Sequence, residues 1–254
     1  MQHSLIFDID LGRTKPNSLR GKKDACPFCD TAHLTDILAQ EGHIIWLLNK
    51  YPVLKNTWPT VIIETNRCHD EFSQYPLDEA TRVLSFSIDK WEETLQRSEF
   101  KSVIYLKNHG PMSGGSLRHP HSQIIGLRDY DYRKDIKEVH FEGWELHNED
   151  DLQITLSNHP IIGFFEFNFI IAKDVNRKRL TLRLQQTVKY ILKAFSYSAS
   201  YNIFFYDLNT NNYYIKVVPR YVTTPIYVGY CISQVCNEKR ALEIRDELNS
   251  FYTK

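Results

Sequence analysis

The sequence has no excess of charge of either sign, few cysteines and no long apolar run. Lysine plus arginine and aspartate plus glutamate each number 31, so the net charge is +0 with histidine neutral. A chain without a basic excess has no overall field that attracts nucleic acid. No segment approaches the roughly 18 apolar residues of a membrane span. The first residues of the sequence also lack the charged stretch and following apolar run that are typical of a signal peptide. We therefore expect a soluble, cytoplasmic protein without nucleic-acid or membrane partners.

The few cysteines that are present exclude one class of protein and leave two kinds of site. Five cysteines in 254 residues are an odd and sparse set, unlike the disulfide framework of a small secreted domain. Cys26 and Cys29 form a Cys-Pro-Phe-Cys pair, which is typical of a redox motif or of half a zinc site. Redox pairs usually lie at the strand-to-helix turn of a βαβ unit, and no clear βαβ pattern surrounds this pair.

Apolar runs bounded by turn residues predict strands in both halves of the chain. Aromatic residues make up 13% of the sequence, which favours strands over a helical bundle. Two segments, from Ala80 to Leu95 and from Leu180 to Phe195, repeat apolar residues at the spacing of one helix face. The predicted strands are 44–49, 61–65, 102–108 and 121–127, followed by 152–156, 164–172, 201–208 and 213–218.

The order strand, strand, helix, strand, strand therefore occurs twice. The two helices are offset by about 100 residues, which indicates an internal structural duplication. We expect residues 1–130 to form one half and residues 131–254 the other, with the polar stretch 129–151 at the junction and a last helix over 237–251. The predicted fold class is α+β, with two pseudo-repeated halves.

The two halves differ in the loop before their last strand. The second half has a tight turn, 209–212, whereas the first half has the longer segment 108–118 with Gly110, Gly114 and Gly115. A hairpin normally needs about two to five residues. The extra length and the glycines predict a loop that brings backbone close to a ligand, with a plain hairpin extension as the alternative.

This loop leads into His119-Pro120-His121-Ser122-Gln123. Side chains two positions apart point to the same face of a strand, so His119, His121 and Gln123 share one face. A single histidine is usually structural, but three polar groups in register beside a glycine loop indicate a site. An imidazole that is neutral near pH 7 can act as a nucleophile without a strong base.

The loop and the histidines resemble the His-Pro-His-x-Gln active-site motif of the galactose-1-phosphate uridylyltransferase branch of the histidine-triad superfamily, which includes an uncharacterised bacterial uridylyltransferase-like group. The resemblance implies a HIT-like fold with antiparallel sheet and helices packed on one face. It also implies a covalent role for His121, which attacks the α-phosphorus of a nucleotide, and phosphoryl contacts for Gln123 and Ser116. The loop residues that fit the family as substrate-binding positions are Asn108, Gly114 and Gly115.

Two further segments resemble substrate-binding parts of this family. Asn49-Lys50-Tyr51-Pro52 resembles the signature that binds base and ribose, with Asn49 as the candidate contact and an ordinary strand-end turn as the alternative. The basic residues Arg13, Lys15 and Arg20 precede the cysteine pair, where family arginines bind phosphate, although most such charges are simply solvated.

The same resemblance implies a zinc ion bound by Cys26, Cys29, His69 and His119. Such a closed Cys₂His₂ set leaves no position for water, so the metal is structural. Cys68 is a rival to His69, because neighbours on a strand point in opposite directions and only one of them faces the site. The alternative is that these residues bind no metal.

The leading functional prediction is a nucleotidyltransferase that acts on a nucleotide sugar or related nucleotide through a covalent His121–nucleoside monophosphate intermediate, in a ping-pong reaction. The alternatives are a dinucleoside polyphosphate or nucleotide-sugar phosphorylase or hydrolase, a nucleotide-binding or sensing protein without activity, and a zinc-stabilised interaction module. The partner is a small-molecule nucleotide, and a homodimer is plausible from the resemblance. The second half lacks a His-Pro-His segment, and we expect Lys216–Arg220 to occupy the matching position.

Overall fold

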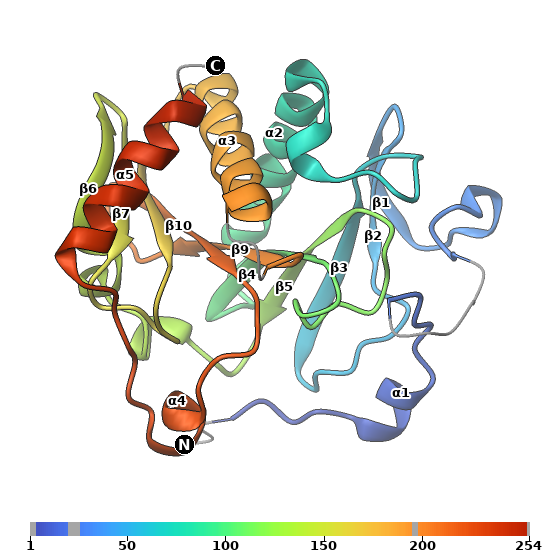
Figure 1. Ribbon diagram of the computed structural model, residues 1–254. Coiled ribbons are helices and arrows are strands. Elements are labelled where there is room, and N and C mark those ends of the chain that lie inside the picture. The colour runs from blue at the N-terminus through green and yellow to red at the C-terminus, as the bar shows by residue number, and fades with distance from the viewer. Residues whose placement is uncertain (1–3, 20–25, 195–197, 253–254) are drawn as a thin grey trace. The chain divides into compact units, whose positions relative to one another are not determined.

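A computed structural model describes residues 4–19, 26–194 and 198–252 of the chain (Figure 1). The chain divides into two compact units, Met1–Arg133 and Lys134–Lys254, and each contains five strands that pair in antiparallel fashion. Along the described parts of the chain, no helix combines the length and the apolar character needed to cross a membrane.

The first unit contains five antiparallel strands in the order β1-β2-β3-β5-β4, with α2 between β3 and β4 in the chain. Helix α2 packs against β4 and β5. The strands are β1 Ile37–Glu41, β2 Ile44–Leu48, β3 Thr57–Ile63, β4 Ser102–His109 and β5 His121–Leu127. The helices are α1 Ile9–Arg13, η1 Thr31–His33, η2 Phe72–Gln74 and α2 Leu77–Leu95.

The second unit repeats this plan, with strand order β6-β7-β8-β10-β9 and α3 between β8 and β9 in the chain. Helix α3 packs against β10, and α5 packs against α3 and β6. The strands are β6 Gly143–Glu149, β7 Leu152–Ser157, β8 Phe167–Ala172, β9 Tyr201–Asp207 and β10 Asn212–Pro219. The helices are η3 Tyr132–Lys134 at the junction, η4 Glu138–Phe141, α3 Arg177–Ala194, α4 Pro225–Tyr230 and α5 Glu238–Tyr252. The predicted α+β class and the repeated halves are confirmed.

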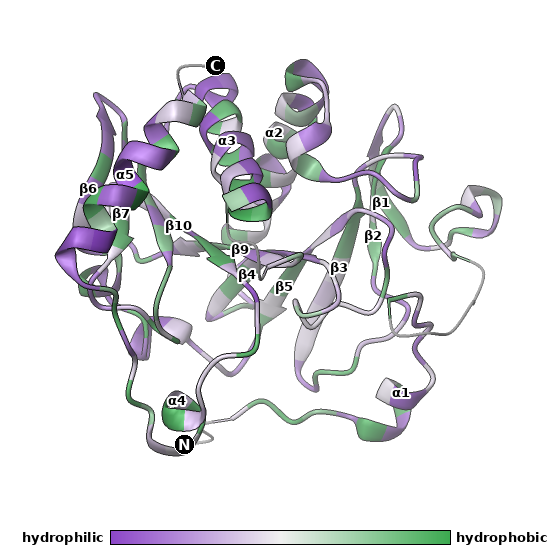
Figure 2. Cartoon of the chain, in the orientation of Figure 1, coloured by the Kyte–Doolittle hydropathy of each residue, from purple (hydrophilic) through white to green (hydrophobic). Residues whose placement is uncertain are grey.

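The two long helices form because one stripe of each is apolar and can be buried. In α2, Ala80 and Trp91 are fully buried, and the Trp91 indole N–H donates to the Val103 carbonyl of β4 at 3.2 Å. In α3, Leu180 and Leu184 are likewise fully buried. Figure 2 shows apolar and polar residues alternating along both helices. Burial of each large apolar side chain contributes about 1.5–3 kcal/mol to the stability of the fold. A helix with several such residues on one face is therefore strongly favoured, and the spacing of these residues predicts it from the sequence. Phe195, the last residue of the predicted stripe, lies outside the described residues.

Two edge strands, β1 and β6, were not predicted, because neither has a strong apolar alternation. Strand β1 is mostly exposed, and β6 contains glutamate, histidine and asparagine. Strand β3 begins at Thr57 rather than at residue 61. The prediction was too short because proline has no backbone N–H and is usually excluded from strands, yet Pro59 lies within this one. Strand β8 begins at Phe167 rather than at residue 164, because Phe164 has a φ of 58° and cannot continue a strand.

The expected counterpart of the histidine motif in the second unit is also corrected. His121 is the first residue of β5, and the first residue of β10 is Asn212. Asn212 therefore matches His121, whereas Lys216 lies in the middle of its strand. The prediction failed because the apolar run in this part of the sequence does not show where the strand begins. In the structure, β10 begins directly after the tight turn.

Candidate active site and metal centre

A cavity of about 590 Å³ opens in the first unit, at the ends of β2, β3 and β5. It brings together all the residues predicted for catalysis and substrate binding: Asn49, Asn108, Gly114, Gly115, Ser116, His121 and Gln123. Strand register explains part of this wall, since Leu47 pairs with Val61 and Val61 pairs with Gln123. Leu47 and Val61 therefore provide an apolar surface beside the polar Gln123. A concave site of this size with a few polar groups is typical of a small-molecule pocket.

His121 is held in one tautomer by the backbone. Its side chain is 8% exposed, and its Nδ1 lies 2.7 Å from the carbonyl oxygen of His119. A carbonyl oxygen can only accept, so Nδ1 carries the proton and Nε2 keeps its lone pair. Burial lowers the pKa of His121 to about 4, and the nearby Lys107 ammonium adds to this effect. The imidazole is therefore neutral at pH 7 and available as a nucleophile.

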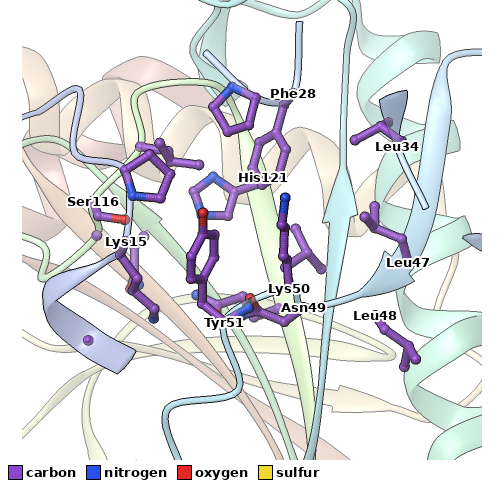
Figure 3. Close-up of a pocket in the computed structure, with 18 of the residues that line it drawn as sticks. Lys15, Phe28, Leu34, Leu47, Leu48, Asn49, Lys50, Tyr51, Ser116 and His121 are labelled. Carbon is purple, nitrogen blue, oxygen red and sulfur yellow. Dashed lines mark hydrogen bonds between the residues drawn. The ribbon is translucent and has the colours of Figure 1, made fainter. Parts of the chain in front are cut away.

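Phe28, between the two cysteines of the pair, packs against both histidines. Its ring lies edge-on to the His121 ring at 5.4 Å and to the His119 ring at 5.8 Å between centroids. It also packs with Leu34 against a buried cluster that includes Leu47. Figure 3 shows Phe28 beside His121, with Leu34 and Leu47 to one side of them. These three side chains form an apolar face that suits a flat, poorly hydrated group such as a nucleobase.

The glycine loop has a backbone conformation that residues other than glycine rarely adopt. Gly110 and Gly114 have φ values of 83° and 86°, in the region that favours glycine. Inside the loop, the Ser113 hydroxyl donates to the Gly110 carbonyl at 2.7 Å. The Ser116 carbonyl accepts the Ser18 amide N–H at 2.9 Å, which ties the loop to the N-terminal segment. The backbone of Ser116 is thereby fixed, and Figure 3 shows its side chain at the cavity.

Asn49 also has a defined orientation. Its side-chain oxygen accepts the backbone N–H of Tyr51 at 2.9 Å, and its backbone N–H donates to the Pro59 carbonyl at 2.9 Å. The side-chain oxygen is therefore engaged, and the side-chain NH₂ is the group that it can offer as a donor to a ligand.

Of the basic residues considered from the sequence, Lys15 lines the cavity. Its pKa is lowered by burial. Arg13 is exposed and lies 3.7 Å from Asp10, and Arg20 lies outside the described residues. A half-buried ammonium beside the glycine loop favours an anionic ligand in this cavity.

Next to the cavity, Cys26, Cys29, Cys68 and His119 present ligand atoms that all lie within 4.8 Å of one another. His119 is fully buried, with its Nδ1 at 3.5 Å from each of the Cys26 and Cys29 sulfurs. Its Nε2 donates to the Thr65 carbonyl at 2.7 Å, which leaves the Nδ1 lone pair directed at the thiols. A second hydrogen bond of this kind is the usual orienting contact of a metal-binding histidine.

The fourth member of this group differs from the predicted set: Cys68 is present and His69 is not. The two residues lie in the turn after β3, where Cys68 is half-buried and His69 is exposed. Adjacent side chains diverge, so only one of them reaches the group, and the turn selects the cysteine. Three thiols and one imidazole are an established zinc donor set, so the residues present fit a structural metal ion.

Sequence reasoning also missed a buried ion pair near the site. Lys107 and Glu64 lie 2.7 Å apart with side chains that are 7% and 3% exposed, and the Tyr75 hydroxyl donates to the same carboxylate at 3.1 Å. A lysine directly after the apolar run 103–106 of β4 was the available signal. Phe28 and Tyr51 were missed as well, although both stand inside motifs that were recognised.

Comparisons with known proteins agree with this architecture. Residues 7–130 match the N-terminal domain of DUF4931, a domain of unknown function, and residues 133–252 match its C-terminal domain. A crystal structure of a DUF4931 family protein from Bacillus cereus is 44% identical and covers 86% of this chain and 100% of its own, with a TM-score of 0.78.

More distant proteins share the fold. The ADP-glucose phosphorylase of Arabidopsis thaliana, solved with bound ADP-glucose, is 15% identical over 96% of this chain and 98% of its own, with a TM-score of 0.70. The galactose-1-phosphate uridylyltransferase of Thermotoga maritima is 23% identical over 143 residues, which are 49% of this chain and 44% of that protein. The chain thus spans less than half the length of that curated relative. The predicted resemblance to the uridylyltransferase-like branch is confirmed for the fold.

Proposed function

The chain belongs to the DUF4931 family, and we propose that it is a nucleotidyltransferase that transfers a nucleoside monophosphate through His121. The observation that carries the proposal is the 2.7 Å hydrogen bond from His121 Nδ1 to the His119 carbonyl. This bond leaves an unprotonated Nε2 on an imidazole that lines the cavity. The donor is a nucleotide sugar or a related nucleotide with a pyrophosphate bond, in line with the uridylyltransferase and ADP-glucose phosphorylase among its relatives.

The reaction has two displacements. In the first, the Nε2 lone pair attacks the phosphorus of the nucleoside monophosphate unit, the bond to the bridging oxygen breaks, and its electron pair leaves with the second phosphate. In the second, an oxygen of a phosphorylated acceptor attacks the same phosphorus, and the electron pair of the phosphorus–nitrogen bond returns to Nε2. Splitting one transfer into two easier steps is the general advantage of covalent catalysis.

The remaining cavity residues supply binding and charge stabilisation. Gln123, Ser116 and the backbone N–H of Gly114 donate to phosphoryl oxygens, which carry the developing charge, and Gly115 brings the loop backbone to the cavity wall. The apolar face of Phe28, Leu34 and Leu47 holds the base, with Asn49 and Asn108 as polar contacts. Lys15 faces the charge of the leaving phosphate.

The cluster of three cysteines and one histidine fits zinc, and we propose that Cys26, Cys29, Cys68 and His119 hold the ion. Bound zinc supplies a rigid structural anchor, because the four protein ligands leave no place for water. His119 and Phe28 connect the metal-binding residues to the nucleophile. The carbonyl of His119 accepts the hydrogen bond from His121, and Phe28 packs on the His121 ring.

Intact-mass analysis tests the proposal. The protein is incubated separately with UDP-glucose, ADP-glucose and diadenosine tetraphosphate. We expect a mass increase of one nucleoside monophosphate with at least one donor, which disappears in His121→Ala and persists in His159→Ala, an exposed histidine of the second unit. An adduct that survives His121→Ala contradicts the assigned nucleophile.

Acceptor analysis then separates the related activities. We expect the adduct to discharge to a sugar 1-phosphate, with hexose 1-phosphates as the first compounds to test. Discharge to orthophosphate alone identifies a phosphorylase, and discharge to water alone identifies a hydrolase. Nucleotide binding without an adduct and without turnover of any donor identifies a binding or sensing protein and overturns the proposal.

A further inference from the structure

Tyr51 occupies a fixed position at the wall of the cavity, in the segment that joins β2 to β3. Its backbone N–H donates to the Asn49 side chain at 2.9 Å, and its carbonyl accepts the Val53 N–H at 2.8 Å. Val53 is buried, and the proline at position 52 restricts the Tyr51 backbone to extended conformations. The ring is therefore carried by a constrained backbone, unlike the side chain of a mobile surface tyrosine.

The hydroxyl group of this tyrosine can be offered to a ligand. The Tyr51 side chain is half-buried, and among the described residues no hydrogen-bond partner for its hydroxyl is found. Figure 3 shows the Tyr51 side chain standing in the cavity with its hydroxyl directed toward His121. Gln123 and Ser116 reach the cavity from β5 and the glycine loop. Tyr51 thus adds a donor from a third element, at the level of the nucleophile.

We propose that Tyr51 is a catalytic residue whose hydroxyl donates a hydrogen bond to a nonbridging oxygen of the phosphoryl group that His121 attacks. This inference rests on the proposed function. As the bond from Nε2 to phosphorus forms and the bond to the leaving oxygen breaks, negative charge gathers on the nonbridging oxygens. A donor fixed in advance stabilises that charge more than it stabilises the bound donor molecule. No proton changes place: the phenol keeps its hydrogen throughout.

The chemistry of the phenol makes this role testable with a single atom. Tyr51→Phe keeps the ring, its packing and the restricted backbone, and removes only the hydroxyl. A role in filling space or in stacking on the nucleoside is unaffected by the change, whereas a hydrogen bond to the phosphoryl oxygen is lost. The expected effect lies on the rate of the chemical step rather than on binding of the donor.

The experiment follows adduct formation in a single turnover. UDP-glucose, ADP-glucose and diadenosine tetraphosphate are each mixed at saturating concentration with the wild type, Tyr51→Phe and Tyr230→Phe, and samples quenched over time are analysed by intact mass. Tyr230 is 78% exposed in the second unit and serves as the matched control. We expect Tyr51→Phe to form the adduct about 10- to 100-fold more slowly, and Tyr230→Phe to match the wild type.

Two further measurements exclude a structural explanation. The melting temperature of Tyr51→Phe is expected to equal that of the wild type. The Kd of the same donors, measured by calorimetry in His121→Ala with and without Tyr51→Phe, is expected to change by less than about 3-fold. The His121→Ala background prevents turnover, so this comparison reports binding alone.

The outcomes separate this inference from the proposed function. An adduct that forms at the wild-type rate in Tyr51→Phe overturns the role of Tyr51 and leaves the role of His121 intact. A slower rate that is matched by an equal loss of donor affinity also overturns it, because the hydroxyl then acts in binding only. A wild-type protein that forms no adduct and turns over none of the three donors contradicts the proposed function, and the inference falls with it.

Discussion

The two units have the same strand order and the same central helix, yet among the described residues the candidate site lies in the first unit. In the first unit, β4 and β5 are joined by the glycine loop and the histidines, and β5 begins at His121. In the second unit, β9 and β10 are joined by a tight turn in which Asn209 has a φ of 60°, and β10 begins at Asn212. The shared scaffold thus fixes where a strand starts, and the preceding loop decides whether that position has chemistry.

A buried ion pair also lies in each unit, and the surroundings of the two pairs differ. In the second unit, the Lys216 ammonium lies 2.8 Å from Glu166, and it donates to the Asn168 side chain and the His140 carbonyl at 2.7 Å. Glu166 in turn accepts backbone N–H groups of Ile161 and Ile162, at 3.0 and 2.8 Å. The first unit's pair, Lys107 and Glu64, lies close enough to His121 to affect its pKa. The second unit's pair joins β10 to β8 and η4.

The largest expected effect comes from giving the first unit the residue of the second. His121→Asn is expected to lower the rate of adduct formation about 10⁴-fold or more, since asparagine has no nucleophilic lone pair. The reverse change, Asn212→His, is expected to create no adduct, because the tight turn provides no phosphate-binding loop. Intact mass after incubation with the nucleotide donors measures both. An adduct on residue 212 of the variant would show that the loop is dispensable.

The metal group sharpens the comparison, because the second unit has no equivalent of it among the described residues. Cys68→Ser is expected to weaken zinc binding more than about 100-fold, since one of four ligands is lost. His69→Ala and Cys231→Ser are expected to retain zinc. Zinc content per chain is measured by mass spectrometry, and thiolate-to-cobalt absorption of the cobalt-loaded protein counts the sulfur ligands. Loss of zinc in His69→Ala with retention in Cys68→Ser would restore the set expected from sequence.

The ion pairs are compared by removing one partner from each. Lys216→Met leaves the Glu166 carboxylate buried and unpaired, and it is expected to lower the free energy of unfolding by about 3–5 kcal/mol. Partial recovery is expected in the double variant Lys216→Met/Glu166→Gln. Urea unfolding measures the loss, and adduct formation by the folded fraction is expected to stay unchanged. A stability loss below about 1 kcal/mol would contradict the structural role assigned to Lys216.

The smallest expected effect concerns pH. Burial tends to raise the pKa of Glu149, but hydrogen bonds from His147 and Arg183 outweigh it and lower the pKa below 4.5. A carboxyl group with a lowered folded-state pKa stabilises the fold above its unfolded pKa, and this stability disappears as the pH falls through the folded value. Glu149→Gln is therefore expected to lower the free energy of unfolding at pH 7 by about 1 kcal/mol and to flatten its decline below pH 4.5. Urea titrations at several pH values measure both changes.

Much of the fold followed from periodicity, because the stripes of α2 and α3 and the apolar runs of the central strands depend only on local sequence. Most of the predicted residues of the catalytic and substrate sites lie in one cavity for a similar reason, since the motif and its loop are contiguous. Asn49 joins them because β2 pairs with β3 and β3 pairs with β5. The fourth member of the metal group was not predictable, since the choice between Cys68 and His69 depends on the direction of a turn. Edge strands β1 and β6 lacked a signal, because an exposed strand needs no apolar alternation.

His119 has three contacts that are made by different atoms of one residue. Its Nδ1 faces the thiols, its Nε2 donates to Thr65, and its carbonyl accepts from the nucleophile. For protein engineering, this means that the histidine motif alone cannot transfer the covalent chemistry of His121 to another protein. A design that transplants the reactive imidazole to another scaffold has to carry the thiol cluster and the Thr65 carbonyl along with it, or else supply a new acceptor that holds the same tautomer.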